Sequence, residues 1–246
     1  MHSSLPPEDS VALREQVIAS ARALNERGIN VNKAGNVSAR CTRGAQPGFV
    51  ITPSALPYDA LTAGDLVFMR VGDGRPSGTR RPSSEWRFHH DLYAARPEFA
   101  AIVHTHSPHA TALACHWRGI PAFHYMVAQA GGRDIRCARY ETFGTQELAD
   151  AAVGAMEDRR ACLLAHHGVI ACGATLDAAL ALAIEVEHLA RIYLLALQVG
   201  EPQVLDEAEM ARVIERFGGY GRGLPTATHW APETATPADE RCDAAD

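Results

Sequence analysis

Two histidines stand two residues apart in the segment AIVHTHSPH, at His104 and His106. The residues before them are apolar and β-branched, which is typical of a buried strand. Residues two apart on a strand point to the same face, so the two imidazoles would lie side by side. Such a pair supplies half of a metal site, although a pair of structural histidines is the commoner meaning of this spacing.

A third histidine for the same site is available in LLAHHGVIACG, at His166 or His167. Adjacent strand residues face opposite ways, so we expect at most one of them to share a pocket with the other two. Catalytic zinc usually takes three protein ligands and leaves one position open. The chain has twelve histidines, which makes chance pairings easy, and the spacing alone leaves the metal site undecided.

A carboxylate follows two hydroxyl groups in SSEWRFH, where Glu85 comes directly after Ser83 and Ser84. A glutamate at the start of a helix is favourable for the helix dipole and needs no further role. The two serines can bind an anion at a helix start. The segments AGNVSAR (34–40) and ITPSALP (51–57) can also present backbone N–H groups to an anion. Three such segments beside a histidine cluster and one acid suit a small anionic substrate held next to a metal.

Helices and short strands must position these residues, and the strands and helices do not alternate strictly along the chain. We predict a single α/β domain over residues 1–224, with a central, mainly antiparallel sheet flanked by helices, because the strands come in short hairpin-like clusters. A loose tail, rich in Pro, Thr, Ala and acidic residues, is expected over 225–246. The predicted helices are 8–27, 85–95, 109–116, 146–159, 176–198 and 206–216. The predicted strands are 36–40, 49–52, 66–71, 101–106 and 133–138, with two more inside 161–172, and 72–78 is predicted to be a loop.

The composition excludes several classes of protein. Of the 246 residues, 47% are apolar, the net charge is −6, and no basic run occurs, so nucleic acid is not an expected partner. No stretch is long and apolar enough to span a membrane, and the N-terminus does not resemble a signal peptide. The six cysteines form no CxxC motif, which favours reduced thiols and a cytoplasmic protein.

Several of these segments, in this order, resemble the class II aldolase/adducin family, and most closely its fuculose-phosphate aldolase branch. The matching segments cover about 28–221. They are AGNVSAR, ITPSALPYDAL, PSSEWRFH, IVHTHSPH, IPAFHYMVAQAGG, ETFGTQEL, LLAHHGVIAC and EVEHLARIYLLAL. The resemblance implies a central antiparallel sheet and a homotetramer with active sites at the subunit interfaces.

The resemblance also implies a role for individual residues. The metal ligands would be His104, His106 and His167, holding Zn²⁺ or another divalent cation. Glu85 would be the catalytic acid/base and would also reach the resting metal. Tyr125, in the HYM segment, would reach the site of a neighbouring subunit and handle the proton on the aldehyde oxygen.

The substrate phosphate would be bound by three pairs of residues. These are Gly35 and Asn36, Ser54 and Ala55, and Ser83 and Ser84. One position departs from the family pattern TP[ST]G, because Ala55 stands where glycine is usual. Glycine permits positive φ and close backbone approach, so we expect this alanine to reshape the phosphate pocket slightly.

The implied activity is zinc-dependent cleavage of a ketose 1-phosphate to dihydroxyacetone phosphate and an aldehyde. The substrate would be L-fuculose 1-phosphate, or 5-deoxyribulose or 5-methylthioribulose 1-phosphate. A Schiff-base aldolase needs a lysine, and the chain has a single one, Lys33, which favours the metal route independently. The alternatives are a dehydratase or decarboxylase of the same family acting on a sugar (acid) phosphate, and a non-catalytic, adducin-like interaction module.

Overall fold

The computed structural model describes residues 6–219, which form a mixed α/β fold around one eight-stranded sheet. The helices are α1 (Val11–Glu26), α2 (Trp86–Ala95), α3 (Pro108–Cys115), α4 (Gln146–Ala155), α5 (Leu176–Val199) and α6 (Glu207–Gly219), with 3-10 helices η1 (Tyr58–Ala60), η2 (Ala63–Asp65) and η3 (Tyr125–Ala130). The strands are β1 (Asn36–Arg43), β2 (Gln46–Ile51), β3 (Val67–Arg70), β4 (Pro76–Ser77), β5 (Ala101–Thr105), β6 (Arg136–Ala138), β7 (Ala161–Leu164) and β8 (Gly168–Gly173).

The strand order across the sheet is β4-β3-β2-β1-β5-β8-β7-β6. Its neighbouring strands are antiparallel, except that β6 runs parallel to β7. The predicted fold class, a single domain with a mainly antiparallel sheet flanked by helices, is therefore confirmed. The central pair, β1 and β5, places Asn36 directly opposite His104.

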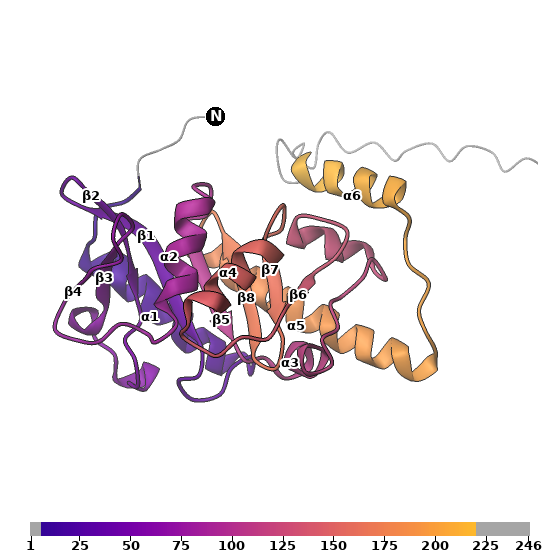
Figure 1. The fold of residues 1–246 in the computed structure, drawn as a ribbon, viewed down its shortest axis with the longest axis horizontal. Helices are drawn as coiled ribbons and strands as arrows, with labels where there is room; N and C mark the ends of the chain where they lie inside the picture. Colours follow the sequence, from indigo (N-terminus) through magenta and orange to yellow (C-terminus); the bar gives the residue numbers. More distant parts are fainter. Residues whose placement is uncertain (1–5, 220–246) are drawn as a thin grey trace, which may run out of the picture.

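Helices cover both faces of the sheet, and the alternation of side chains along the strands divides the core in two (Figure 1). On one face, Val103 and Val169 pack with residues of α1, α3 and α5. On the other, Ile102 and Ile170 pack with residues of α2 and α4. His104 follows Ile102 with the spacing of two, so its ring lies on the α2 side, with an edge-to-face contact to Phe88.

The elements agree with the predicted ranges except at a few ends. β1 runs on to Arg43 because it forms a tight hairpin with β2, in which Arg43 pairs with Gln46; the polar residues there hid the hairpin from the sequence pattern. The loop predicted over 72–78 contains the short strand β4. Helix α4 ends at Ala155, four residues earlier than predicted, and the turn after it gives Asp158 a positive φ of 55°.

The predicted tail, 225–246, lies outside the described residues, and so does the end of the predicted domain at 224. Helix α6 is set apart from the other helices in Figure 1, at the end of an extended connection from α5, and it packs on η3. Within residues 6–219, no helix combines the length and apolar character needed to cross a membrane.

Candidate active site

Three imidazoles and one carboxylate meet at one end of the central strands. The ligand-capable atoms of Glu85, His104, His106 and His167 all lie within 4.8 Å of one another. His104 lies in β5, His106 just after it, and His167 in the turn between β7 and β8. Glu85 is the residue directly before α2. The four residues that the sequence proposed as metal ligands are thus brought together.

Close backbone packing holds these elements in register and explains two glycines. A Cβ atom at Gly168 would lie 2.4 Å from the carbonyl oxygen of Thr105, so only glycine lets the turn carrying His167 approach the end of β5. A Cβ atom at Gly35 would lie 2.3 Å from the carbonyl oxygen of His104. The close approach of β1, β5 and β8 therefore depends on glycines next to the site residues.

A carboxylate from α5 anchors the segment that follows His106. Glu187 is buried and accepts hydrogen bonds from the backbone N–H groups of His109 and Ala110, both 3.0 Å long. These groups belong to the first turn of α3, whose N–H groups have no partner inside the helix. Glu187 thereby fixes the start of α3, two residues after His106, a metal-ligand candidate.

The hydrogen bonding of His104 leaves one ring nitrogen free to bind a cation. Its Nδ1 lies 2.8 Å from the carbonyl oxygen of Val169 and must donate a proton to it. In the neutral ring, Nε2 then carries a lone pair, and it faces Nε2 of His106 at 3.1 Å and Oε2 of Glu85 at 3.2 Å. A backbone carbonyl that orients a histidine in this way is typical of metal sites.

One buried oxygen of the cluster accepts no well-formed hydrogen bond from the described part of the chain. Oε1 of Glu85 lies 2.9 Å from Nε2 of His167 but makes no hydrogen bond. A buried, unpaired carboxylate oxygen is costly unless a cation or proton satisfies it. Three nitrogens and a carboxylate form a donor set that suits zinc and related divalent ions, so the residues fit the metal that the sequence proposed.

The surroundings of Glu85 and His106 favour the protonation states that a metal ligand needs. Burial would raise the pKa of Glu85, but His104 and His167 outweigh burial and hold that pKa well below its usual range. Burial, helped by the neighbouring His104 and His167, lowers the pKa of His106 to about 4. At neutral pH the carboxylate is therefore ionised and the His106 ring is neutral, as metal binding requires.

The cluster opens into a cavity of about 290 Å³. Its lining residues are Ala34, Ser84, Glu85, His106, Tyr140, Glu141, Phe143, His166 and His167. Sequence reasoning did not single out Tyr140, Glu141 or Phe143 as site residues, although the last two lie in the matching segment ETFGTQEL. Phe143 is 66% exposed and Tyr140 49% exposed, so aromatic surface faces the cavity and solvent.

The two adjacent histidines lie differently from the prediction. They sit in a turn rather than a strand, with a φ of 53° at His166, and both line the cavity. The expectation that only one would share the pocket is therefore wrong. Only His167 joins the cluster, because Nε2 of His166 accepts a hydrogen bond of 2.9 Å from the indole N–H of Trp117.

The three proposed anion-binding segments are contiguous. The N–H of Ser54 donates to the carbonyl of Arg81, and the N–H of Ser83 donates to the carbonyl of Thr52. The N–H of Val37 donates to the hydroxyl of Thr52 at 3.2 Å, which joins the first segment to the second. These hydrogen bonds join the three segments that carry the six proposed phosphate-binding residues.

Within this group the residues differ in their surroundings. Ser84 lines the cavity, Ser83 is buried beside it, and Ser54 and Ala55 are exposed. The amide of Asn36 is already engaged, donating to Oε2 of Glu85 at 2.9 Å. Ala55 has a φ of +67°, the conformation that glycine adopts freely, and its carbonyl accepts a hydrogen bond from Lys33.

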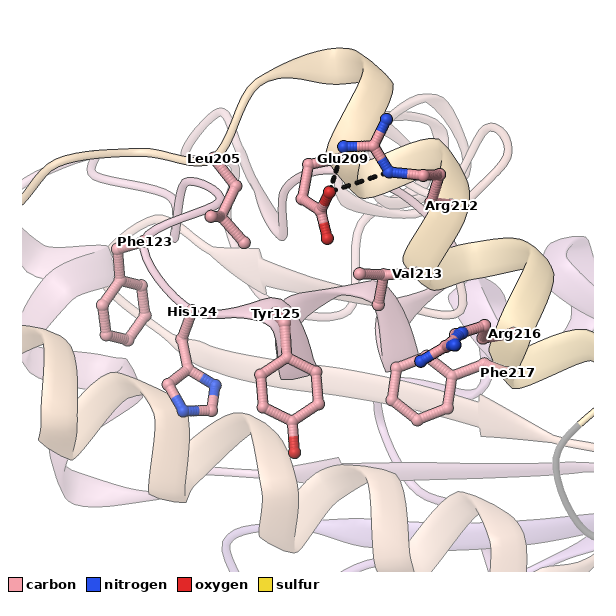
Figure 2. A pocket seen from close by; sticks show the side chains of 9 residues that line it. All are labelled: Phe123, His124, Tyr125, Leu205, Glu209, Arg212, Val213, Arg216 and Phe217. Carbon is pink, nitrogen blue, oxygen red and sulfur yellow. Dashed lines mark hydrogen bonds and ion pairs between the residues drawn. The ribbon is translucent and has the colours of Figure 1, made fainter. Parts of the chain in front are cut away.

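Tyr125 lies away from this cavity, in a separate and larger pocket between η3 and α6 (Figure 2). Its ring is 50% exposed and lies parallel to that of Phe217, with 6.4 Å between the ring centroids. Arg216 and the paired residues Glu209 and Arg212 also line this pocket. The structure therefore does not bring Tyr125 to the metal cluster of its own chain.

Comparison with known proteins places the chain in a family. The family model described as "Class II Aldolase and Adducin N-terminal domain" matches residues 15–194. A 5-methylthioribulose-1-phosphate/5-deoxyribulose-1-phosphate aldolase of Rhodospirillum rubrum is 54% identical over 215 residues, which cover 87% of this chain and 95% of the relative. An L-fuculose phosphate aldolase of Escherichia coli K12 is 46% identical over 210 residues, covering 85% and 95%.

A solved structure agrees with these relatives. An L-fuculose 1-phosphate aldolase superposes with a TM-score of 0.81 at 41% identity, covering 85% of this chain and 97% of that one. The residues that the family model matches, 15–194, include Glu85, His104, His106 and His167. The chain belongs to the class II aldolase and adducin family, and within it to the aldolases, which are lyases.

Proposed function

We propose that the protein is a zinc-dependent aldolase that cleaves a ketose 1-phosphate to dihydroxyacetone phosphate and an aldehyde. The convergence of Glu85 with three histidines beside contiguous anion-binding segments is the observation that carries this proposal. A non-catalytic, adducin-like module would have no use for four buried or half-buried ligands around one point. The aldolase relatives argue against a dehydratase or decarboxylase.

The reaction breaks the C3–C4 bond and leaves the electron pair on C3. A divalent cation held by His104, His106 and His167, with Glu85 alongside, would supply the positive charge that stabilises this electron pair. In the aldol-addition direction the ionised carboxylate of Glu85, a residue that lines the cavity, would take the proton from C3 of dihydroxyacetone phosphate, and in cleavage the resulting carboxyl group would return that proton to C3. The proton that leaves the C4 hydroxyl would pass to Tyr125 of a neighbouring subunit.

The phosphate would be held by the same six residues that the sequence proposed: Gly35, Asn36, Ser54, Ala55, Ser83 and Ser84. The hydrogen bonds that join their segments support this assignment. Holding the phosphate fixes the distance from C3 to the carboxylate of Glu85, which is how positioning lowers a barrier. Lys33 is exposed and bound to the carbonyl of Ala55, a place that does not suit a Schiff-base lysine.

We propose 5-deoxyribulose or 5-methylthioribulose 1-phosphate as the substrate. Two observations favour a substrate whose end opposite the phosphate is apolar. The exposed rings of Tyr140 and Phe143 lie at the cavity, and the chain is 54% identical to the Rhodospirillum rubrum relative. L-fuculose 1-phosphate is the second candidate, favoured by the Escherichia coli relative. It would give lactaldehyde, whose hydroxyl group would meet the same aromatic surface.

We further propose a homotetramer in which Tyr125 completes the site of a neighbouring subunit. The half-exposed ring of Tyr125, away from the cavity of its own chain, supports this arrangement. The free cysteines among the described residues support a cytoplasmic location.

A substrate panel tests the proposal. The purified, zinc-loaded protein would be given each of the three ketose 1-phosphates, and dihydroxyacetone phosphate release would be followed with a coupled reductase. We expect release from all three, with the highest kcat/KM for the 5-deoxy or 5-methylthio sugar. Release from none would defeat the aldolase proposal, and a mass loss of water or carbon dioxide would indicate the dehydratase or decarboxylase instead.

A further inference from the structure

Behind Glu85 lies a chain of four further polar side chains, all of them buried. Asn36 donates to Oε2 of Glu85 at 2.9 Å, and Oδ1 of Asn36 lies 2.5 Å from Nε2 of His89. Nδ1 of His89 lies 2.7 Å from the hydroxyl of Ser38, which lies 2.9 Å from the hydroxyl of Tyr93. All five side chains belong to residues at most 5% exposed, so water does not compete for these contacts.

The ionised carboxylate fixes the direction of every bond in this chain. A carboxylate only accepts, so Asn36 must turn its NH₂ group towards Glu85 and its oxygen towards His89. Nε2 of His89 must then carry a proton, and Nδ1 must accept one from Ser38. Tyr93, in turn, donates to Ser38. Each link has one consistent donor, and the chain ends at Glu85.

His89 adds no charge to this arrangement. Burial, together with the nearby His104, lowers the pKa of His89 to about 3, so the ring is neutral at physiological pH. Its ring also stacks on Phe88, with 4.8 Å between the centroids, which limits rotation. The network therefore directs one N–H group at Oε2 and leaves Oε1 without a hydrogen bond among the described residues.

We infer that His89 is a positioning residue, which holds the amide of Asn36 so that Asn36 fixes the carboxylate of Glu85 in its working orientation. This inference rests on the proposed function, in which Glu85 transfers the proton at C3. Without the N–H of His89, the oxygen of Asn36 loses its buried partner and the amide is no longer held with its NH₂ group on Glu85. The buried oxygen of Asn36 would seek another donor, and the carboxylate of Glu85 would lose its fixed orientation.

The test compares His89→Leu with His89→Gln in the zinc-loaded protein. The readouts are deuterium incorporation into dihydroxyacetone phosphate, its KM, bound zinc and the Tm. We expect His89→Leu to lower the exchange turnover on the order of 10- to 100-fold. Zinc content and KM should change little, because only the orientation of the Glu85 carboxylate is disturbed. His89→Gln, whose amide can still donate to Asn36, should recover most of the turnover.

Two further variants separate positioning from mere stability. Ser38→Ala removes the donor that fixes the ring tautomer of His89 and should lower turnover about three- to tenfold. If His89→Leu does not fold, the turnover of Ser38→Ala tests the positioning role instead. Leu92→Ala, in the buried face of the same helix, should lower the Tm but leave turnover within about twofold.

The outcomes distinguish the two claims. If the wild-type protein exchanges no deuterium, the proposed function fails and takes the inference with it. If the wild-type protein exchanges deuterium but both His89→Leu and Ser38→Ala retain full turnover, only the inference is overturned. Turnover that falls in proportion to the Tm in every variant, Leu92→Ala included, would also overturn it.

Discussion

Oε1 of Glu85 lies 2.9 Å from Nε2 of His167, and no hydrogen bond accounts for this approach. A carboxylate oxygen and an imidazole nitrogen brought this close inside a protein need a cation or a proton between them. The other oxygen of Glu85 lies 3.2 Å from Nε2 of His104. Glu85 thus contacts histidines from two different strand ends, which draws the four residues into one cluster.

The adjacent histidines provide a matched test of metal binding. His167→Ala should reduce bound zinc to below about a tenth of an ion per chain, because a nitrogen ligand is lost from a three-histidine site. His166→Ala should retain about one ion, since His166 bonds to Trp117 instead. Zinc per chain would be measured by mass spectrometry after gel filtration. Equal zinc content in both variants would contradict the ligand assignment.

Glu85→Gln should preserve the fold and most of the bound zinc while abolishing proton transfer. The three histidines remain, but the amide cannot accept a proton at neutral pH. We expect deuterium exchange into dihydroxyacetone phosphate to fall about 10²- to 10⁴-fold, the range typical of a lost acid/base group. Full exchange by this variant would remove Glu85 from the mechanism.

Ala55→Gly should relieve strain in the phosphate loop. An L-residue at a φ of +67° costs about 1–2 kcal/mol. Glycine offsets about 0.4–1 kcal/mol of this through its greater freedom when unfolded. We expect a net gain of about 0.5 kcal/mol in unfolding free energy, and a lower KM for dihydroxyacetone phosphate. Chemical denaturation and exchange kinetics would measure both effects.

A control for this variant is Ala60→Gly, at an exposed alanine without positive φ. It should lower the unfolding free energy by about 0.5–1 kcal/mol and leave KM unchanged. If both variants were destabilised equally, the strain at Ala55 would not exist.

The metal-free protein should lose stability as the pH falls from 7 to 5. The folded-state pKa values of His89 and His106 are lowered to about 3 and 4, so the unfolded chain takes up protons first, near its ordinary pKa of 6.5. Stability from these rings is complete above that value and declines below it. The carboxylate of Glu85, whose pKa is lowered, loses its contribution only at more acidic pH.

We expect the Tm to fall on the order of 5 °C between pH 7 and pH 5. Scanning calorimetry of chelator-treated protein would measure it. His89→Gln, which removes one of the two titrating rings, should show a shallower decline. A Tm that is constant or rises over this range would show that the two rings are not buried in the neutral form.

The sequence predicted the elements of this site better than their connections. HxH, HHG and SSE are short patterns that can be found in the sequence alone. Strand periodicity then placed His104 and His106 on the same face of one strand. The turn geometry of His166 was missed, because a residue with positive φ between two strands cannot be distinguished by periodicity from a strand residue. β4 was missed because its two residues lie within a Gly- and Pro-rich stretch.

The network behind Glu85 has no signature in the sequence. Asn36 is close to Glu85 only because β1 pairs with β5 and places it opposite His104. His89 reaches Asn36 because it lies one helical turn after Glu85 on α2, with its side chain buried against the sheet. Such contacts depend on strand register and helix packing together, which no single segment encodes.

The most direct test of the account is a titration of Zn²⁺ into chelator-treated protein, with 5-deoxyribulose 1-phosphate present and dihydroxyacetone phosphate release followed throughout. We expect no release at the start and a linear rise that ends at about one ion per chain. Full release before any metal is added, or no release at any metal concentration, would contradict it.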